Sequence, residues 1–195
     1  MFSQKRAEVI INCDTFIDLY DKCDVGCEVC KFNVNIKDIS QNTIDFNKYK
    51  NNKVLFCYKT DPYVRDDLEL VEKIIKKLHK NNCKIVFLTR KAELLLNQLS
   101  IFNENDFVGV SISENCTKNS SIDDIIKVLK TANELGIKTW ISLEPVITAE
   151  FANNIVNKIG KYADFIRVGK DDLIDYNWDE VKNNIKTAKN VYVKD

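Results

Sequence analysis

Residues 121–143, SIDDIIKVLKTANELGIKTWISL, contain one complete helix–turn–strand unit, and similar units follow one another along most of the chain. Ser121 begins the predicted helix with a near capping box, in which Asp124 replaces the usual glutamate. Gly136 suits the turn that ends the helix, and residues 139–143 form an apolar run typical of a buried strand. The helix carries one apolar stripe, made of Ile122, Ile125, Ile126, Leu129, Ala132 and Leu135.

Short apolar runs and amphipathic helical segments alternate along almost the whole chain. Further helices are predicted after Asp67, after Thr148 and from Trp178 onward. The apolar runs predict strands at residues 7–20, 54–59, 84–88, 107–111, 139–143, 164–168 and 191–193. Alternation of this kind predicts parallel strands joined by right-handed helical crossovers.

About six strand–helix units fit into the chain, fewer than the eight of a closed TIM barrel. We therefore expect an α/β fold, a partial (β/α)6 barrel of parallel strands with outer helices, open on one side. No linker, repeat or low-complexity tract divides the sequence. Residues 1–195 are expected to form a single domain without an accessory domain.

Basic and acidic residues are equal in number, at 29 each. No overall field therefore attracts nucleic acid or an anionic membrane, although a local basic groove for nucleic acid remains compatible with this balance. No apolar run approaches the roughly 20 residues that a membrane-spanning helix needs, and the first residues lack the apolar stretch of a secretory signal. Seven cysteines, an odd count, indicate reduced thiols. We expect a cytoplasmic protein without membrane contact.

Small and polar residues share one face of the predicted sheet, because side chains alternate between faces along a strand. These residues are Gly109, Ser111 and Ser113, then Ser142 and Glu144, then Arg167 and Gly169. A filled barrel interior is built mainly from bulky branched side chains, and parallel sheets are normally covered on both faces. The pattern favours a polar interior that holds a ligand over a sheet face exposed to solvent.

Polar residues also follow the carboxyl ends of the strands. They are Thr60 and Asp61, Thr89 and Arg90, Ser111 and Ser113, Glu144, and Lys170. In barrels of this type the active site lies at that end, so we expect the functional site there.

Cys23, Cys27 and Cys30 follow the first predicted strand with the spacing C-x3-C-x2-C. Closed zinc sites and most iron–sulfur clusters have four protein ligands. Three clustered cysteines without a fourth ligand nearby therefore favour a cluster that leaves one iron open to an exogenous ligand. Zinc is the alternative, because any of the scattered cysteines could close the site in space: Cys13, Cys57, Cys83 and Cys116.

This cysteine loop, placed after the first strand of a partial barrel, resembles the radical S-adenosylmethionine (SAM) superfamily. The resemblance covers nearly the whole chain. It implies a [4Fe–4S] cluster on Cys23, Cys27 and Cys30, with the amino and carboxylate groups of SAM on the fourth iron. Four segments resemble the spore photoproduct lyase-like and phage-type branch: FCYKTDPY at 56–63, VFLTRK at 86–91, VSIS at 110–113 and SLEPV at 142–146.

By position, the resemblance implies SAM contacts at several strand ends. Thr60 and Asp61 match the element that binds the SAM amino group. Arg90 stands where that branch has a cation for the SAM carboxylate. Ser111 and Ser113 match the contact to the ribose.

The resemblance also suggests roles for Glu144, Val29 and Cys57. Glu144 falls in the motif that lies near the cofactor in the family. Val29 stands where the family usually has an aromatic residue, and its branched side chain would still pack on adenine. Cys57 roughly matches the hydrogen-donor cysteine of spore photoproduct lyase, although a buried cysteine is commonly a small hydrophobe. His79, the single histidine, is expected to be a solvated surface residue.

The resemblance implies an enzyme that reductively cleaves SAM to a 5′-deoxyadenosyl radical, which abstracts hydrogen from an unidentified substrate. The expected partners are an external electron donor and a macromolecular substrate or partner subunit that encloses the radical. Two alternatives remain. One is an activase of a glycyl-radical enzyme, and the other is a non-catalytic module that binds zinc, an iron–sulfur cluster or SAM.

Overall fold

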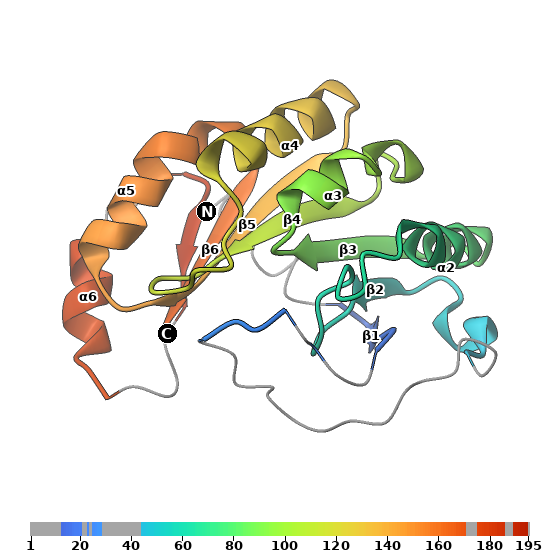
Figure 1. Cartoon of the computed structure of the whole chain (residues 1–195), viewed down its shortest axis with the longest axis horizontal. Coiled ribbons are helices and arrows are strands. Elements are labelled where there is room, and N and C mark those ends of the chain that lie inside the picture. Colours follow the sequence, from blue (N-terminus) through green and yellow to red (C-terminus); the bar gives the residue numbers. More distant parts are fainter. Residues whose placement is uncertain are drawn as a thin grey trace.

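The computed structural model describes residues 13–20, 23, 25–28, 44–170, 175–185 and 189–194. Seven parallel strands form one open sheet, in which each strand pairs with the next one along the chain (Figure 1). The strands are β1 (Thr15–Ile17), β2 (Lys53–Phe56), β3 (Lys84–Thr89), β4 (Phe107–Ile112), β5 (Lys138–Val146), β6 (Phe165–Lys170) and β7 (Val191–Val193). The helices are α2 (Leu68–Lys80), α3 (Ala92–Leu96), α4 (Ile122–Glu134), α5 (Ala149–Ile159) and α6 (Trp178–Asn184).

The predicted partial barrel of parallel strands with outer helices is confirmed, with seven strands where about six units were expected. The first strand is shorter than the run at 7–20, of which the structure describes only residues 13–20. α3 was not predicted. None of the helices in the described part of the chain combines the length and apolar character that crossing a membrane requires.

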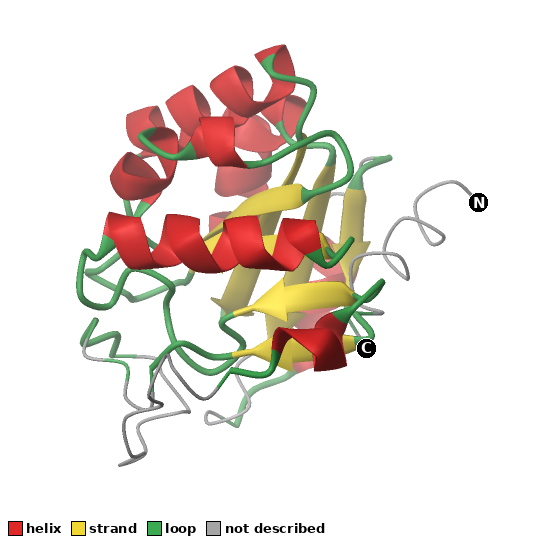
Figure 2. Ribbon diagram, turned by 90° about the vertical axis from the view of Figure 1, so that its right-hand side faces the viewer, coloured by secondary structure: helices red, strands yellow, loops and turns green. Residues whose placement is uncertain are grey.

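The helices lie along one face of the sheet and build the main core there (Figures 1 and 2). Three of them begin at side chains that accept a hydrogen bond from the first turn, which stabilises a helix N-terminus. Asp67 accepts from Leu70 N at 2.9 Å, Ser121 from Asp124 N at 3.1 Å and Thr148 from Phe151 N at 3.2 Å. The predicted caps at Ser121 and Thr148 are therefore confirmed, and Asp67 adds a third cap. Gly136 follows α4 with a φ of +73°, as the turn requires.

The opposite face, here called the inner face, carries Leu55, Val86, Gly109, Trp140 and Phe165. Leu55 is in register with Val86 across β2 and β3, and Gly109, Trp140 and Phe165 are in register across β4, β5 and β6. Val86, Trp140 and Phe165 form a second, smaller buried cluster. The Trp140 indole N–H donates to the Phe87 carbonyl at 3.1 Å. A Cβ at Gly109 would lie 2.4 Å from that indole nitrogen, so only glycine fits. The prediction of a polar interior therefore does not hold in this layer.

The prediction for His79 is wrong. Its ring is 21% exposed, and Nε2 lies 2.8 Å from Oδ2 of Asp106, whose side chain is fully buried. Asp106 also accepts hydrogen bonds from Ile85 N at 2.8 Å and Asn103 N at 2.9 Å. The contact therefore links α2 to the turn before β4, because His79 lies in α2 and Asp106 directly precedes β4.

Candidate cluster and cofactor site

Three of the predicted site residues meet at the carboxyl ends of β3, β4 and β5. Arg90 Nη2 donates to the Ser113 hydroxyl at 2.6 Å, and that hydroxyl donates to the main-chain carbonyl of Glu144 at 2.5 Å. Arg90 Nη1 donates to the side-chain oxygen of Asn119 at 3.0 Å. Arg90 thus links three strand ends through hydrogen bonds rather than extending into solvent.

Asn119 was not predicted, and it closes the loop that follows β4. Its oxygen accepts from Ser113 N at 3.0 Å, and its nitrogen donates to the Ser113 carbonyl at 2.7 Å. This reciprocal pair fixes both ends of the segment from Ser113 to Asn119. A sequence pattern does not reveal it, because asparagine is common in any loop.

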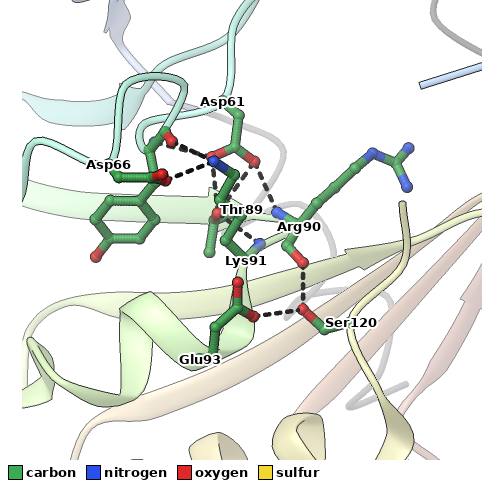
Figure 3. Close-up of polar contacts among 8 residues, drawn as sticks. Asp61, Asp66, Thr89, Arg90, Lys91, Glu93 and Ser120 are labelled. Carbon is green, nitrogen blue, oxygen red and sulfur yellow. Dashed lines mark hydrogen bonds and ion pairs between the residues drawn. The ribbon is translucent and has the colours of Figure 1, made fainter. Parts of the chain in front are cut away.

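Asp61 lies at the centre of a hydrogen-bond network that joins the turn after β2 to the end of β3 (Figure 3). Its carboxylate accepts from the Thr89 hydroxyl at 2.8 Å, from Arg90 N at 2.7 Å and from Tyr63 N at 2.9 Å. Burial raises the pKa of Asp61, and these hydrogen bonds partly offset that effect. In the structure the Asp61 carboxylate holds the turn after β2 against the end of β3. Its contact with a SAM amino group stays a prediction.

The main chain on both sides of Arg90 is held in the same network. Lys91 donates to the Tyr63 carbonyl at 2.8 Å and to Asp66 at 2.6 Å, and the Ser120 hydroxyl donates to the Arg90 carbonyl. Figure 3 shows the Arg90 guanidinium extending away from these contacts. Its position is therefore set by the network at its base and by Ser113 and Asn119 at its tip.

Glu144 lies on the inner face between two cations. Its Oε1 is 2.8 Å from Lys194 Nζ, and its Oε2 is 3.7 Å from Arg167 Nη2. Ser111, Ser142 and Arg167 are in register below it across β4, β5 and β6. The predicted polar row is therefore present on the inner face in the half nearest the carboxyl ends of the strands.

Cys57 and Thr60 lie in the turn after β2 and are both buried. The Thr60 hydroxyl lies beside the Cys57 thiol, and burial raises the pKa of that thiol far above its usual value. Cys57 is therefore a neutral thiol at neutral pH. Its role as a hydrogen donor stays a prediction.

Cys23 and Cys27 are half-buried in one loop, whereas Cys30 and Val29 lie outside the described residues. Burial raises the pKa of Cys27 to about 12, the Arg90 guanidinium lowers it, and the Cys116 and Cys23 thiols raise it. Val25 of the same loop and Arg90 line one cavity, so the predicted cysteine loop lies near the predicted cation at the carboxyl edge of the sheet.

The loop after β4 holds the cysteine loop in place. The Glu28 carboxylate accepts hydrogen bonds from the Thr117 hydroxyl and, at 3.3 Å, from Thr117 N. The hydroxyl contact is the main reason why the pKa of the exposed Glu28 is lowered to about 2. A cavity of about 370 Å³ lies beside this contact, and its lining includes Val25, Arg90, Lys118 and Asn119.

The donor set fits an iron–sulfur cluster. Two free thiols of the motif, Cys23 and Cys27, lie in the loop whose Val25 lines the same cavity as Arg90, and thiolates are the protein ligands of such clusters. None of the cysteines in the described ranges forms a disulfide. Within the same ranges, no group of three His, Cys, Asp or Glu side chains is arranged around a single ion.

No protein-family model matches the chain, and no curated protein matches it. Several solved structures do. Streptococcus suis SuiB bound to precursor peptide SuiA is 16% identical, with a TM-score of 0.61 over 87% of this chain and 44% of SuiB. A mutant of spore photoproduct lyase with dinucleoside spore photoproduct is 14% identical, with a TM-score of 0.52 over 80% of this chain and 53% of the lyase.

The chain has the fold of radical SAM enzymes. SuiB bound to S-adenosylmethionine also shares this radical SAM fold, at 15% identity and a TM-score of 0.60 over 87% of this chain and 42% of SuiB. The chain spans about half the length of these proteins. At such low identity the likeness is one of fold, and it confirms the fold that the cysteine loop and the strand pattern predict.

Proposed function

We propose that this chain is a radical SAM enzyme. Cys23, Cys27 and Cys30 would hold a [4Fe–4S] cluster, whose open iron would bind SAM. When bound and reduced, the cluster would supply the electron that cleaves SAM into methionine and a 5′-deoxyadenosyl radical. The observation that supports this most strongly is a cavity at the carboxyl edge of a radical SAM fold, which is lined both by Val25 of the cysteine loop and by Arg90.

The protein's own residues would bind and orient SAM. Arg90 is fixed near Cys27, and a guanidinium forms strong paired hydrogen bonds with a carboxylate, such as that of SAM. Ser111 and Ser142 offer hydroxyl groups on the inner face, where Glu144 offers a carboxylate. Thr60 and Asp61 would contact the amino group, and Val29 the adenine. The site would thus place a charged cofactor between fixed polar groups.

Anaerobic reconstitution with iron and sulfide tests the proposal. Addition of SAM and dithionite should then yield 5′-deoxyadenosine, measured by chromatography. Cys27→Ala should lose both the cluster absorption and the product, because one ligand is missing. Cys83→Ala is the matched control, since its thiol donates to the Tyr49 carbonyl at 2.9 Å, away from the motif, and it should keep both. Stoichiometric zinc with no visible absorption after reconstitution would contradict the enzyme and favour a zinc module.

We further propose that the substrate is a polypeptide segment that enters at the inner face. Phe16 and Tyr58 are 47% and 50% exposed and lie 5.5 Å apart between ring centroids. Phe16 is in register with Leu55, which places it on the inner face. Exposed aromatic pairs are typical of contact surfaces, and the balanced net charge argues against a nucleic acid. SuiB has been solved with its precursor peptide.

Selection from random linear peptides and from random single-stranded DNA distinguishes these substrates. With the reconstituted protein and SAM, peptides should be enriched. Their binding should weaken about tenfold in Phe16→Ala, the loss expected when an anchoring aromatic side chain is removed. Leu135→Ala is the matched control, because this exposed residue follows α4 and should not affect binding. Enrichment of DNA alone would contradict the polypeptide proposal.

A further inference from the structure

Arg167 lies on the inner face of β6, in a polar row that crosses four strands. Ser111 on β4, Ser142 on β5, Arg167 on β6 and Tyr192 on β7 are in register. Ser142 is buried, whereas the Arg167 side chain is 25% exposed. Arg167 is therefore accessible in part at the polar end of the inner face.

The Arg167 guanidinium has more hydrogen-bond donors than the described residues satisfy. A guanidinium carries five N–H groups. The Nε of Arg167 is buried, and no acceptor in the described part of the chain forms a hydrogen bond with it. Its Nη2 lies 3.7 Å from Oε2 of Glu144, which is too far for a hydrogen bond. Because a buried N–H without an acceptor costs free energy, the side chain suits an additional acceptor.

Glu144 does not neutralise Arg167, because Lys194 competes for the same carboxylate. Lys194 Nζ donates to Glu144 Oε1 at 2.8 Å, a hydrogen-bond distance, whereas Arg167 is held only at the longer ion-pair distance. One carboxylate thus lies between two cations, and the three side chains together keep a net positive charge. This charge attracts a further anion to Arg167.

SAM does not offer that anion. The carboxylate is the single anionic group of SAM, and its sulfonium is positive. The proposed function assigns the SAM carboxylate to Arg90, whose guanidinium is bonded to Ser113 and Asn119. Within the proposed site the anion for Arg167 therefore has to come from the substrate.

Resting on the proposed function and its polypeptide substrate, we infer that Arg167 binds a carboxylate of that polypeptide and so selects acidic segments. A guanidinium pairs with a carboxylate through two parallel hydrogen bonds, which an ammonium group cannot form. The carboxylate is that of an Asp or Glu side chain or of a free carboxyl terminus. Phe16 lies on the edge strand β1, and Arg167 lies beside β7 at the other edge, so the two anchors are on opposite sides of the sheet.

Peptides selected with the reconstituted protein and SAM test the inference by fluorescence anisotropy. The enriched peptides should contain Asp or Glu or should require a free carboxyl terminus. Arg167→Gln should bind them about tenfold more weakly, the loss expected for a charge-assisted hydrogen bond, while it binds SAM like wild type. Lys127→Gln is the matched control, because it removes one positive charge from an exposed pair on α4 and should bind both like wild type.

Changes in the peptide identify the carboxylate. One arm replaces the acidic side chain by its amide, and the other amidates the carboxyl terminus. One of these changes should weaken binding to wild type about tenfold, as the loss of the same charge-assisted contact. That change should weaken binding to Arg167→Gln no further, because both substitutions remove one shared contact. The two peptide arms also decide the matter if Arg167→Gln does not fold.

The outcomes separate the inference from the proposed function. Amidated peptides that bind wild type as tightly as the acidic ones would overturn the inference and leave the polypeptide substrate intact. Weaker SAM binding by Arg167→Gln with unchanged peptide binding would also overturn it, by assigning Arg167 to the cofactor. Enrichment of DNA alone would overturn it together with the polypeptide proposal, whereas formation of 5′-deoxyadenosine would still support the enzyme.

Discussion

The two ends of the inner face differ although the same strands build them. At the amino end, Trp140 and Phe165 fill the space between strands and are almost completely buried. Further along the same strands, Glu144 and Arg167 replace them and keep 21% and 25% of their side chains exposed. Two to four residues along a strand therefore separate a dry layer from a polar, accessible one.

This difference shows how the fold separates stability from binding. Apolar burial at the amino end stabilises the sheet without any specific partner. The carboxyl end contains the partly exposed ion pairs of Glu144, which contribute little to stability but can recognise a charged ligand. Substitutions at the amino end should therefore act on unfolding, and those at the carboxyl end on binding.

Trp140→Ala should have the largest effect on stability. It removes a buried indole and its hydrogen bond to Phe87, and comparable truncations of buried aromatic residues cost about 3–5 kcal/mol. Denaturant unfolding measures this loss. Trp140→Phe is the control and should lose clearly less. If Trp140→Ala unfolds like wild type, the amino end is not the stabilising layer.

Asp61→Asn should have a smaller, pH-dependent effect. Asparagine cannot accept all the hydrogen bonds from Thr89, Arg90 and Tyr63, and losses of this kind cost about 1–3 kcal/mol. Burial raises the pKa of Asp61 in the folded protein, so the folded state binds more protons than the unfolded state between the ordinary pKa of 3.8 and the raised one. In that window the contribution of Asp61 to stability falls as pH rises.

The gap in unfolding free energy between wild type and Asp61→Asn should therefore be widest near the lower end of that window and narrow as pH increases. Denaturant midpoints from acid to neutral pH measure it. Asp66→Asn is the control, because Asp66 is exposed in its pair with Lys91 and its replacement should cost little stability. If the difference in unfolding free energy between wild type and Asp61→Asn instead widens with rising pH, the pKa of Asp61 is not raised by burial.

Much of the fold was predictable because local patterns determine it. Ser121 and Thr148 cap helices as expected, since capping depends on residues three positions apart. α3 was missed because its five residues are too few to show a helical period. The pairing of His79 with Asp106 was missed because it joins residues 27 positions apart, which only the fold brings together.

The site was predictable to the extent that it follows strand alternation. Ser142 and Glu144 were placed on the inner face by parity, but Trp140 has the same parity and turns that layer apolar. Gly109 makes room for the indole, a fit between two strands that no single-strand pattern reveals. The packing of the loop after β4 on the cysteine loop was missed for the same reason, since the bond between Thr117 and Glu28 joins residues 89 positions apart.

Glu144→Gln should alter binding more than stability. The Glu144 ion pairs with Lys194 and Arg167 are partly exposed, and such pairs contribute about 1 kcal/mol or less. If the proposed function is right, SAM should bind more weakly while the iron content stays constant. Calorimetry with the reconstituted protein measures the affinity, and Glu150→Gln, an exposed residue on α5, is the control. Unchanged affinity would remove Glu144 from the site.

Gly169→Ala should have the smallest effect on stability and gives the sharpest comparison between the two ends. A Cβ at this position would lie 2.7 Å from the carboxyl carbon of Glu144 and 2.9 Å from its Oε2. The carboxylate must then move, and because it ends a flexible side chain the cost should be below about 1 kcal/mol, less than usual overpacking. Gly169→Ala leaves the charge of Glu144 unchanged. A loss of SAM affinity like that of Glu144→Gln would therefore show that SAM binding depends on the position of the Glu144 carboxylate.

Gly136→Ala is the counterpart of Gly169→Ala. Alanine is strained at the φ of +73° that Gly136 adopts after α4, so this variant should lose about 1 kcal/mol of stability or more. It should bind SAM like wild type, because no side chain lies within 4 Å of the new methyl group. The two glycines should therefore show opposite profiles, one in binding and one in unfolding. If Gly169→Ala instead keeps its SAM affinity and loses stability, the carboxyl end contributes to the fold, and the division between the two ends of the inner face is wrong.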